Sequence, residues 1–161
     1  MELQRILIQI LILLAVSYSI ICIYVYFFQA KLLYFPTVQN FNNCPSLEDY
    51  QKITINKTRF YYKRQGENTV VFYHGNAGSA CDRGYHRDLL EAEGKSVIIA
   101  EYQGYSNDSK TPSKNGILED VRTIFSFIEK EKLILYAIIG ESIGASVASY
   151  HASLQPPKSL S

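Results

Sequence analysis

The stretch LILYAIIGESIG occupies residues 133–144 and decides the fold class of this chain. Residues 133–139 are apolar and uncharged, which is typical of a strand buried in a parallel sheet. Residues 143–154 have the composition of a helix, and between the two lies the spacing Gly-x-Ser-x-Gly. This order predicts a sharp strand-to-helix turn with Ser142 at its tip, because small residues at Gly140 and Gly144 let the two elements approach closely. Such a turn is typical of a nucleophile elbow.

A second motif follows another apolar run. Residues 68–73 (NTVVFY) predict a buried strand, HGNAGS at 74–79 is a glycine-rich loop, and residues 80–93 have the pattern of a helix. A loop of this kind presents a backbone N–H group to a negative charge. It can also hold a phosphate, but neither G-x-G-x-x-G nor G-x-x-x-x-G-K-[ST] occurs, so a nucleotide site is disfavoured.

The remaining apolar runs define the sheet. Residues 95–102 (KSVIIAEY) predict a further buried strand, and an amphipathic helix pattern follows over residues 117–128. Strands and helices therefore alternate from residue 68 onward, which favours a parallel sheet with right-handed crossovers. Alternating runs at 52–56 and 59–63 predict two antiparallel strands ahead of it. The predicted fold class is α/β.

Taken in order, four motifs resemble the α/β-hydrolases, and more narrowly their membrane-anchored serine hydrolases related to acyl-protein thioesterases. They are LYFP at 33–36, HGNAG at 74–78, YQGYS at 102–106 and GESIG at 140–144. The family usually has an arginine and a glycine where this chain has Gln103 and Ser106.

The resemblance implies a reaction and its site. Ser142 would be the nucleophile, and the backbone N–H groups of Asn76 and Ile143 would form the oxyanion hole. The implied reaction is hydrolysis of an ester or thioester through an acyl-enzyme, on a lipid or an acylated protein, with no cofactor and no metal.

The resemblance also implies an acidic residue and then a histidine after the nucleophile. No acidic residue follows Ser142, and His151 lies about 13 Å along the predicted helix. We expect His74 to bond to local backbone and His86 to be solvated. The chain is thus expected to be a truncated hydrolase domain, inactive alone, with later strands missing and residues 133–139 at a sheet edge. The alternative is a non-catalytic remnant or interaction protein.

The N-terminus predicts a membrane segment. Residues 6–28 contain no charge, and they are long enough to cross the hydrocarbon core of a bilayer. A cleaved signal peptide is the alternative, but its apolar region is usually shorter and ends at small residues. Arg5 and Lys31 flank the span, and the basic residue plus the α-amine before it favour a cytoplasmic N-terminus. The hydrolase portion would then lie on the non-cytoplasmic side.

The predicted organisation is a tail at 1–5, a transmembrane helix at 6–28, a linker at 29–48 and an incomplete hydrolase domain at 49–161. A formal net charge of +1 gives no electrostatic reason to expect a nucleic acid partner. The three cysteines, Cys22, Cys44 and Cys81, are scattered along the chain. Their spacing predicts neither a disulfide framework nor a metal site.

Overall fold

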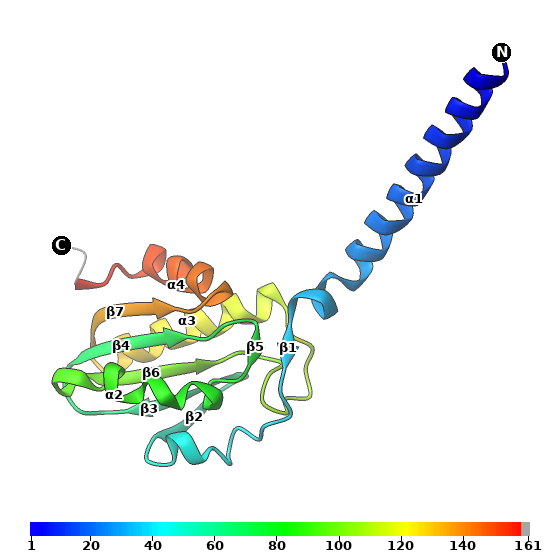
Figure 1. Cartoon of the computed structure of the whole chain (residues 1–161). Coiled ribbons are helices and arrows are strands. Elements are labelled where there is room, and N and C mark those ends of the chain that lie inside the picture. The colour runs from blue at the N-terminus through cyan, green and yellow to red at the C-terminus, as the bar shows by residue number, and fades with distance from the viewer. Residues whose placement is uncertain (159–161) are drawn as a thin grey trace. The chain divides into compact units, whose positions relative to one another are not determined.

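The computed structural model describes residues 1–158, so the last three residues of the predicted domain lie outside the described part. It divides into two units, Met1–Tyr34 and the domain that begins at Phe35. The first unit is the helix α1 (Glu2–Leu33), which has no buried residue (Figure 1). Among the described residues it is the one helix long and apolar enough to cross a membrane, and a signal sequence has the same properties.

The domain is built on a five-stranded sheet with the order β2-β3-β6-β4-β7 (Figure 1). Strand β3 is antiparallel to β2 and to β6, whereas β4 is parallel to both β6 and β7. The predicted parallel sheet with two antiparallel leading strands is confirmed. Its strands are β2 (Gln51–Ile55), β3 (Thr58–Lys63), β4 (Asn68–Tyr73), β6 (Ser96–Glu101) and β7 (Ile134–Gly140).

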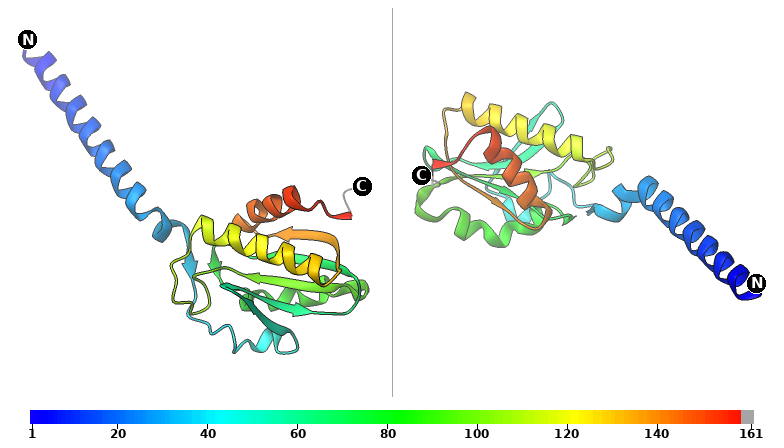
Figure 2. Two further views of the ribbon diagram at one scale, coloured as in Figure 1. Left: turned by 180° about the vertical axis from the view of Figure 1, so that it is seen from behind. Right: turned by 90° about the horizontal axis from the view of Figure 1, so that it is seen from above.

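Two long helices cover one face of this sheet. Helix α3 (Lys114–Lys130) and helix α4 (Ile143–Leu154) lie side by side on that face, as both views of Figure 2 show. Ser113 caps the N-terminus of helix α3, and its side chain accepts a hydrogen bond from the Gly116 N–H. This cap satisfies one of the N–H groups that have no partner within a helix.

The opposite face carries shorter segments than the sequence predicts. In place of one helix over residues 80–93, the chain forms the 3-10 turn η2 (Cys81–His86), the short helix α2 (Arg87–Leu90) and the turn η3 (Ala92–Gly94). A Cβ on Gly84 would lie 2.3 Å from the Ser46 Cβ, so this glycine serves a close approach of two chain segments. Glu93 has a φ of 62°, which ends the helical path.

A disulfide joins Cys44 to Cys81 across a sequence separation of 37 residues. The expectation that the cysteines form no disulfide is therefore wrong. The two sulfur atoms meet because the 3-10 turn η1 (Pro45–Leu47), directly after Cys44, packs on η2, which begins at Cys81. Cys22 is a free, exposed cysteine on α1.

Several tyrosines lie in the core around the sheet. Tyr61, Tyr73 and Tyr102 are fully buried. Each hydroxyl has a partner: Tyr61 donates to the Phe41 carbonyl (2.8 Å) and Tyr102 to the His74 carbonyl (2.7 Å), while the Tyr73 hydroxyl meets a histidine ring. These three tyrosines fill the core with satisfied hydroxyls, whereas the buried Tyr62 hydroxyl has no hydrogen-bond partner among the described residues.

Candidate functional site

Ser142 occupies a sharp turn between the end of β7 and the start of α4. Its backbone angles are φ 54° and ψ −119°, which lie outside the helical and extended regions. A residue other than glycine in such a conformation carries a strain of roughly 1–3 kcal/mol and persists only where the surroundings impose it. The Ser142 side chain is exposed and makes no capping hydrogen bond to α4, so its hydroxyl is accessible.

Backbone contacts impose the turn. A Cβ on Gly140 would lie 2.2 Å from the Gly144 carbonyl oxygen, and a Cβ on Gly144 would lie 2.3 Å from the Tyr73 carbonyl oxygen. The Glu141 N–H donates to the same Tyr73 carbonyl at 2.9 Å. The turn is therefore pressed against the end of β4, and only glycine fits at either of its ends.

The glycine-rich loop that follows β4 is held on two sides. Residues Ala77–Gly78 form the short strand β5, which pairs in parallel with β1 (Phe35–Pro36). The Asn76 carbonyl accepts hydrogen bonds from the Phe35 N–H (2.9 Å) and from the Tyr105 hydroxyl (2.7 Å). The sequence did not indicate this pairing, because two residues are too few to show a strand pattern.

An ion pair joins the loop region to the turn. Arg83 from η2 makes a bidentate contact with Glu141, with Nε to Oε2 at 2.9 Å and Nη2 to Oε1 at 2.8 Å. This hydrogen-bonded guanidinium lowers the pKa of the Glu141 carboxyl. A Cβ on Gly75 would lie 3.1 Å from the Glu141 Oε1. Glu141 is therefore fixed between the loop and η2, directly before Ser142.

The structure thus brings the sequence-predicted site residues into two adjoining segments. Gly140, Ser142, Ile143 and Gly144 lie on the turn, and Asn76 lies on the loop. The two segments touch where Gly144 packs on the backbone of His74. A Cβ added to Gly144 would lie only 2.7 Å from the His74 carbonyl oxygen. Backbone N–H groups at a helix start and in a glycine-rich loop can together bind a negatively charged oxygen.

His74 is buried beneath the loop. Its Nδ1 lies 2.7 Å from the Gly75 carbonyl oxygen, so the expected bond to local backbone is present. Its Nε2 lies 3.3 Å from Oε1 of Glu101, and both side chains have no exposed surface. Local sequence patterns could not identify Glu101 as a partner, since 27 positions separate the two residues.

The other two histidines also have partners. The His151 Nδ1 lies 2.8 Å from the Tyr73 hydroxyl, and both residues are buried. The His86 ring packs against Phe72 and Tyr85, with ring centroids 5.3 Å and 4.2 Å away. The prediction that His86 is simply solvated is wrong, because it is half-buried against these rings.

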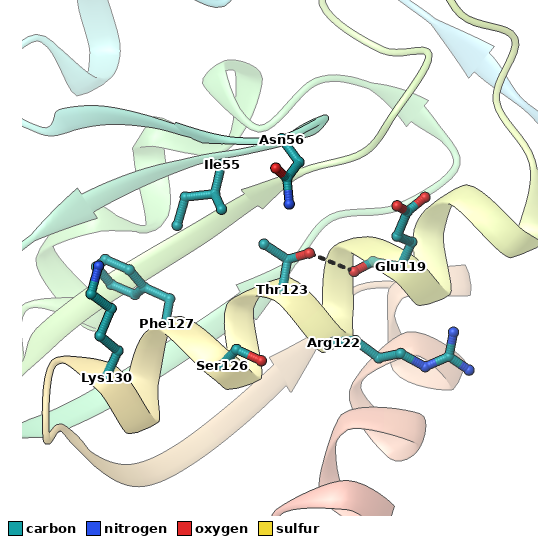
Figure 3. A pocket seen from close by; sticks show the side chains of 8 residues that line it. All are labelled: Ile55, Asn56, Glu119, Arg122, Thr123, Ser126, Phe127 and Lys130. Carbon is teal, nitrogen blue, oxygen red and sulfur yellow. Dashed lines mark hydrogen bonds between the residues drawn. The ribbon is translucent and has the colours of Figure 1, made fainter.

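A cavity of about 380 Å³ lies away from the turn, between the end of β2 and helix α3. Figure 3 shows Asn56 from the β2-β3 turn facing Thr123 and Glu119 on the helix, with Phe127 further along. None of the sequence-predicted site residues lines it. Among the described residues, no group of three or more His, Cys, Asp or Glu side chains could hold a metal ion.

His151 predicts a specific dependence of stability on pH. Burial lowers the pKa of His151 from the ordinary 6.5 to about 4. Between these two pH values the imidazole is protonated in the unfolded chain and neutral in the folded domain. The contribution of His151 to the stability of the folded domain is fully present above pH 6.5, and it is lost as the pH falls toward 4. We expect the stability advantage of the wild type over His151→Asn to fall by about 3 kcal/mol between pH 7 and pH 4.

Urea unfolding of the full chain in detergent micelles, at several pH values, measures this difference. Burial raises the pKa of Asp120 to about 6, which acts in the opposite direction. That effect is common to both proteins and cancels in their difference. A constant difference across this pH range would contradict the assignment of a neutral, buried imidazole.

The sheet, its helices and the Ser142 turn define the α/β-hydrolase fold, and solved structures agree. An alpha-beta hydrolase from Vibrio vulnificus superposes with a TM-score of 0.53 and 28% identity, over 66% of this chain and 41% of its own. The epoxide hydrolase VrEH1 from Vigna radiata superposes with a TM-score of 0.50 over 66% of this chain and 36% of its own. At 18% sequence identity, this likeness is evidence for a shared fold alone.

Two relatives by sequence match this chain over part of their own length. An uncharacterised protein of Mycobacterium tuberculosis is 26% identical over 145 residues, which cover 82% of this chain and 52% of the relative. The uncharacterised protein YfhR of Salmonella typhimurium is 26% identical over 84 residues, or 48% of this chain and 28% of its own. The chain therefore spans about half the length of the first relative. No protein-family model matches it.

Proposed function

We propose that Ser142 is the nucleophile of a serine hydrolase site. The observation that carries this proposal is the conformation of Ser142, an exposed serine at φ 54° on a turn whose two glycines admit no side chain. The strain holds the hydroxyl at the tip of the turn, as in a nucleophile elbow. The α/β-hydrolase fold supports a hydrolase-like activity.

The proposed reaction is hydrolysis of an ester or a thioester. The Ser142 Oγ attacks the carbonyl carbon, and the N–H groups of Asn76 and Ile143 stabilise the oxyanion that forms. The alcohol or thiol leaves, and water then hydrolyses the acyl-enzyme. The substrate would be an acylated lipid or protein, and the proposed chemistry uses no cofactor.

Activation of Ser142 needs a base, and the described histidines have other roles. His74 contacts Gly75 and Glu101, His151 contacts Tyr73, and His86 packs between aromatic rings. A serine hydroxyl without a base in hydrogen-bond reach is a poor nucleophile. We therefore propose that these residues by themselves form an inactive, nucleophile-bearing part of the site.

The engagement of all three histidines with groups other than Ser142 favours a second candidate function. A domain that has the turn but whose histidines are all engaged elsewhere would serve as a non-catalytic remnant or an interaction protein. In that case the apolar strand β7, at one end of the described sheet, would be its binding surface.

We also propose that α1 anchors the chain in a membrane, with the domain on the non-cytoplasmic side. Its length and apolar composition support the anchor. The Cys44–Cys81 disulfide supports the location of the domain on the non-cytoplasmic side, since disulfides persist in oxidising compartments and are rare in the cytoplasm.

A fluorophosphonate probe, which reacts with activated serines, tests the nucleophile. We expect the full chain in detergent micelles to remain unlabelled. The chain joined to a C-terminal segment that supplies an acidic residue and a histidine should be labelled at least about a hundredfold faster, because the base restores the nucleophile.

The controls are two serine variants of the joined protein. Ser142→Ala should abolish labelling, whereas Ser146→Ala, an exposed serine on α4, should leave it unchanged. Labelling that persists in Ser142→Ala would refute the nucleophile. Rapid labelling of the short chain would refute its inactivity, and no labelling of the joined protein would favour the non-catalytic candidate.

A further inference from the structure

One peptide unit of the loop contains the N–H group proposed as an oxyanion donor. The Gly75 carbonyl and the Asn76 N–H belong to the same planar unit, and no peptide bond among the described residues is cis. In a trans peptide the C=O and the N–H point in opposite directions. Any contact that fixes the Gly75 carbonyl therefore also fixes the direction of the Asn76 N–H.

The His74 ring makes such a contact. Its Nδ1 lies 2.7 Å from the Gly75 carbonyl oxygen. A carbonyl oxygen accepts hydrogen bonds and has no proton to donate. The proton in this bond must therefore be on Nδ1, which specifies the protonation of one side of the ring.

The other ring nitrogen faces a carboxylate. His74 Nε2 lies 3.3 Å from Glu101 Oε1, and both side chains have zero exposed surface. Neither atom makes a hydrogen bond of ordinary geometry among the described residues. Buried polar atoms are costly when they have no partner. Each of these two atoms is thus the polar counterpart of the other.

Both partners are themselves held in place. The second oxygen of Glu101 accepts hydrogen bonds from the Ala80 N–H (3.1 Å) and from the Ser106 hydroxyl (2.5 Å). The His74 ring packs against the rings of Tyr102 and Tyr105, with centroids 4.1 Å and 5.1 Å away. Neither side chain can rotate without losing these contacts.

We propose that Glu101 and His74 are positioning residues for the oxyanion hole. Glu101 holds the ring of His74, the Nδ1–H of that ring holds the Gly75 carbonyl, and the peptide unit then directs the Asn76 N–H away from them. The catalytic meaning of this direction rests on the proposed function of Ser142. The direction of the Asn76 N–H bond does not depend on that proposed function.

The first test uses the wild-type full chain in detergent micelles, with nitrogen-15 in its histidine rings. We expect the NMR signal of the His74 Nδ1 at the shift of a protonated ring nitrogen at neutral pH. The His74→Phe variant assigns the signal by its loss. A His74 ring whose Nδ1 lacks a proton would overturn the proposal, because two acceptors cannot share a hydrogen bond.

The second test measures the direction of the N–H bond through residual dipolar couplings of the aligned sample. In Glu101→Gln, the amide oxygen can accept from Ala80 and Ser106 while the amide nitrogen donates to His74 Nε2. We expect this variant to keep the wild-type coupling of Asn76. Glu101→Leu should lose that value while Ile143 keeps its own.

His74→Phe provides a second disruption if Glu101→Leu fails to fold. It retains an aromatic ring against Tyr102 and Tyr105 but removes both ring nitrogens, and we expect the Asn76 coupling to be lost as well. A wild-type coupling at Asn76 in either disrupted variant would overturn the proposal. These measurements are independent of fluorophosphonate labelling, so a failure of the proposed nucleophile and a failure of the positioning pair are distinguishable.

Discussion

Replacement of Gly140 by alanine is expected to destabilise the domain by about 3 kcal/mol or more. The new Cβ would lie 2.2 Å from the Gly144 carbonyl oxygen and 2.5 Å from the Ala145 nitrogen. Both are backbone atoms at the start of α4, so no side chain can move aside to relieve the overlap. Urea unfolding of the full chain in detergent micelles, followed by tyrosine fluorescence, measures the loss.

Gly94→Ala is the matched control. Gly94 has a φ of +67°, but nothing lies within 4 Å of the position of its Cβ. This substitution therefore introduces backbone strain without a clash, and it should cost only roughly 1–2 kcal/mol. Equal losses in the two variants would show that the close contact at Gly140 relaxes easily, and that the turn is not imposed by packing.

Removal of the Cys44–Cys81 disulfide is expected to destabilise the domain by about 4 kcal/mol. The bond closes a loop with a sequence separation of 37 residues, and the cross-link restricts the unfolded chain more strongly as the loop grows. The double variant Cys44→Ala with Cys81→Ala, which leaves no buried thiol, should therefore unfold at a much lower urea concentration.

Two comparisons isolate the effect of the bond. Cys22→Ala removes a free, exposed cysteine on α1 and should leave the unfolding of the domain unchanged. A reducing agent should lower the stability of the wild type and have no effect on the double variant. A wild type whose unfolding is insensitive to reduction would contradict a stabilising disulfide between these cysteines.

Local sequence was sufficient to predict the architecture of the domain. Short apolar runs predict buried strands, and the runs that form β4, β6 and β7 could be identified without knowing which strands they pair with. The turn at Ser142 was predictable for a steric reason, because glycine at Gly140 and Gly144 is the residue that tolerates a backbone carbonyl at van der Waals distance or less. The expected helix over residues 80–93 was wrong, since tertiary contact at Gly84 and the left-handed Glu93 interrupt it.

Partnerships between distant residues were decided only by the tertiary structure. The Cys44–Cys81 disulfide, the Arg83–Glu141 ion pair and the contact of His74 with Glu101 each join segments that no periodicity connects. The sequence by itself determined that a strained serine follows a buried strand, because that property depends on nearest neighbours along the chain. Which side chains surround the serine depends on how strands far apart in sequence are paired in the sheet, and that pairing exists only in the folded domain.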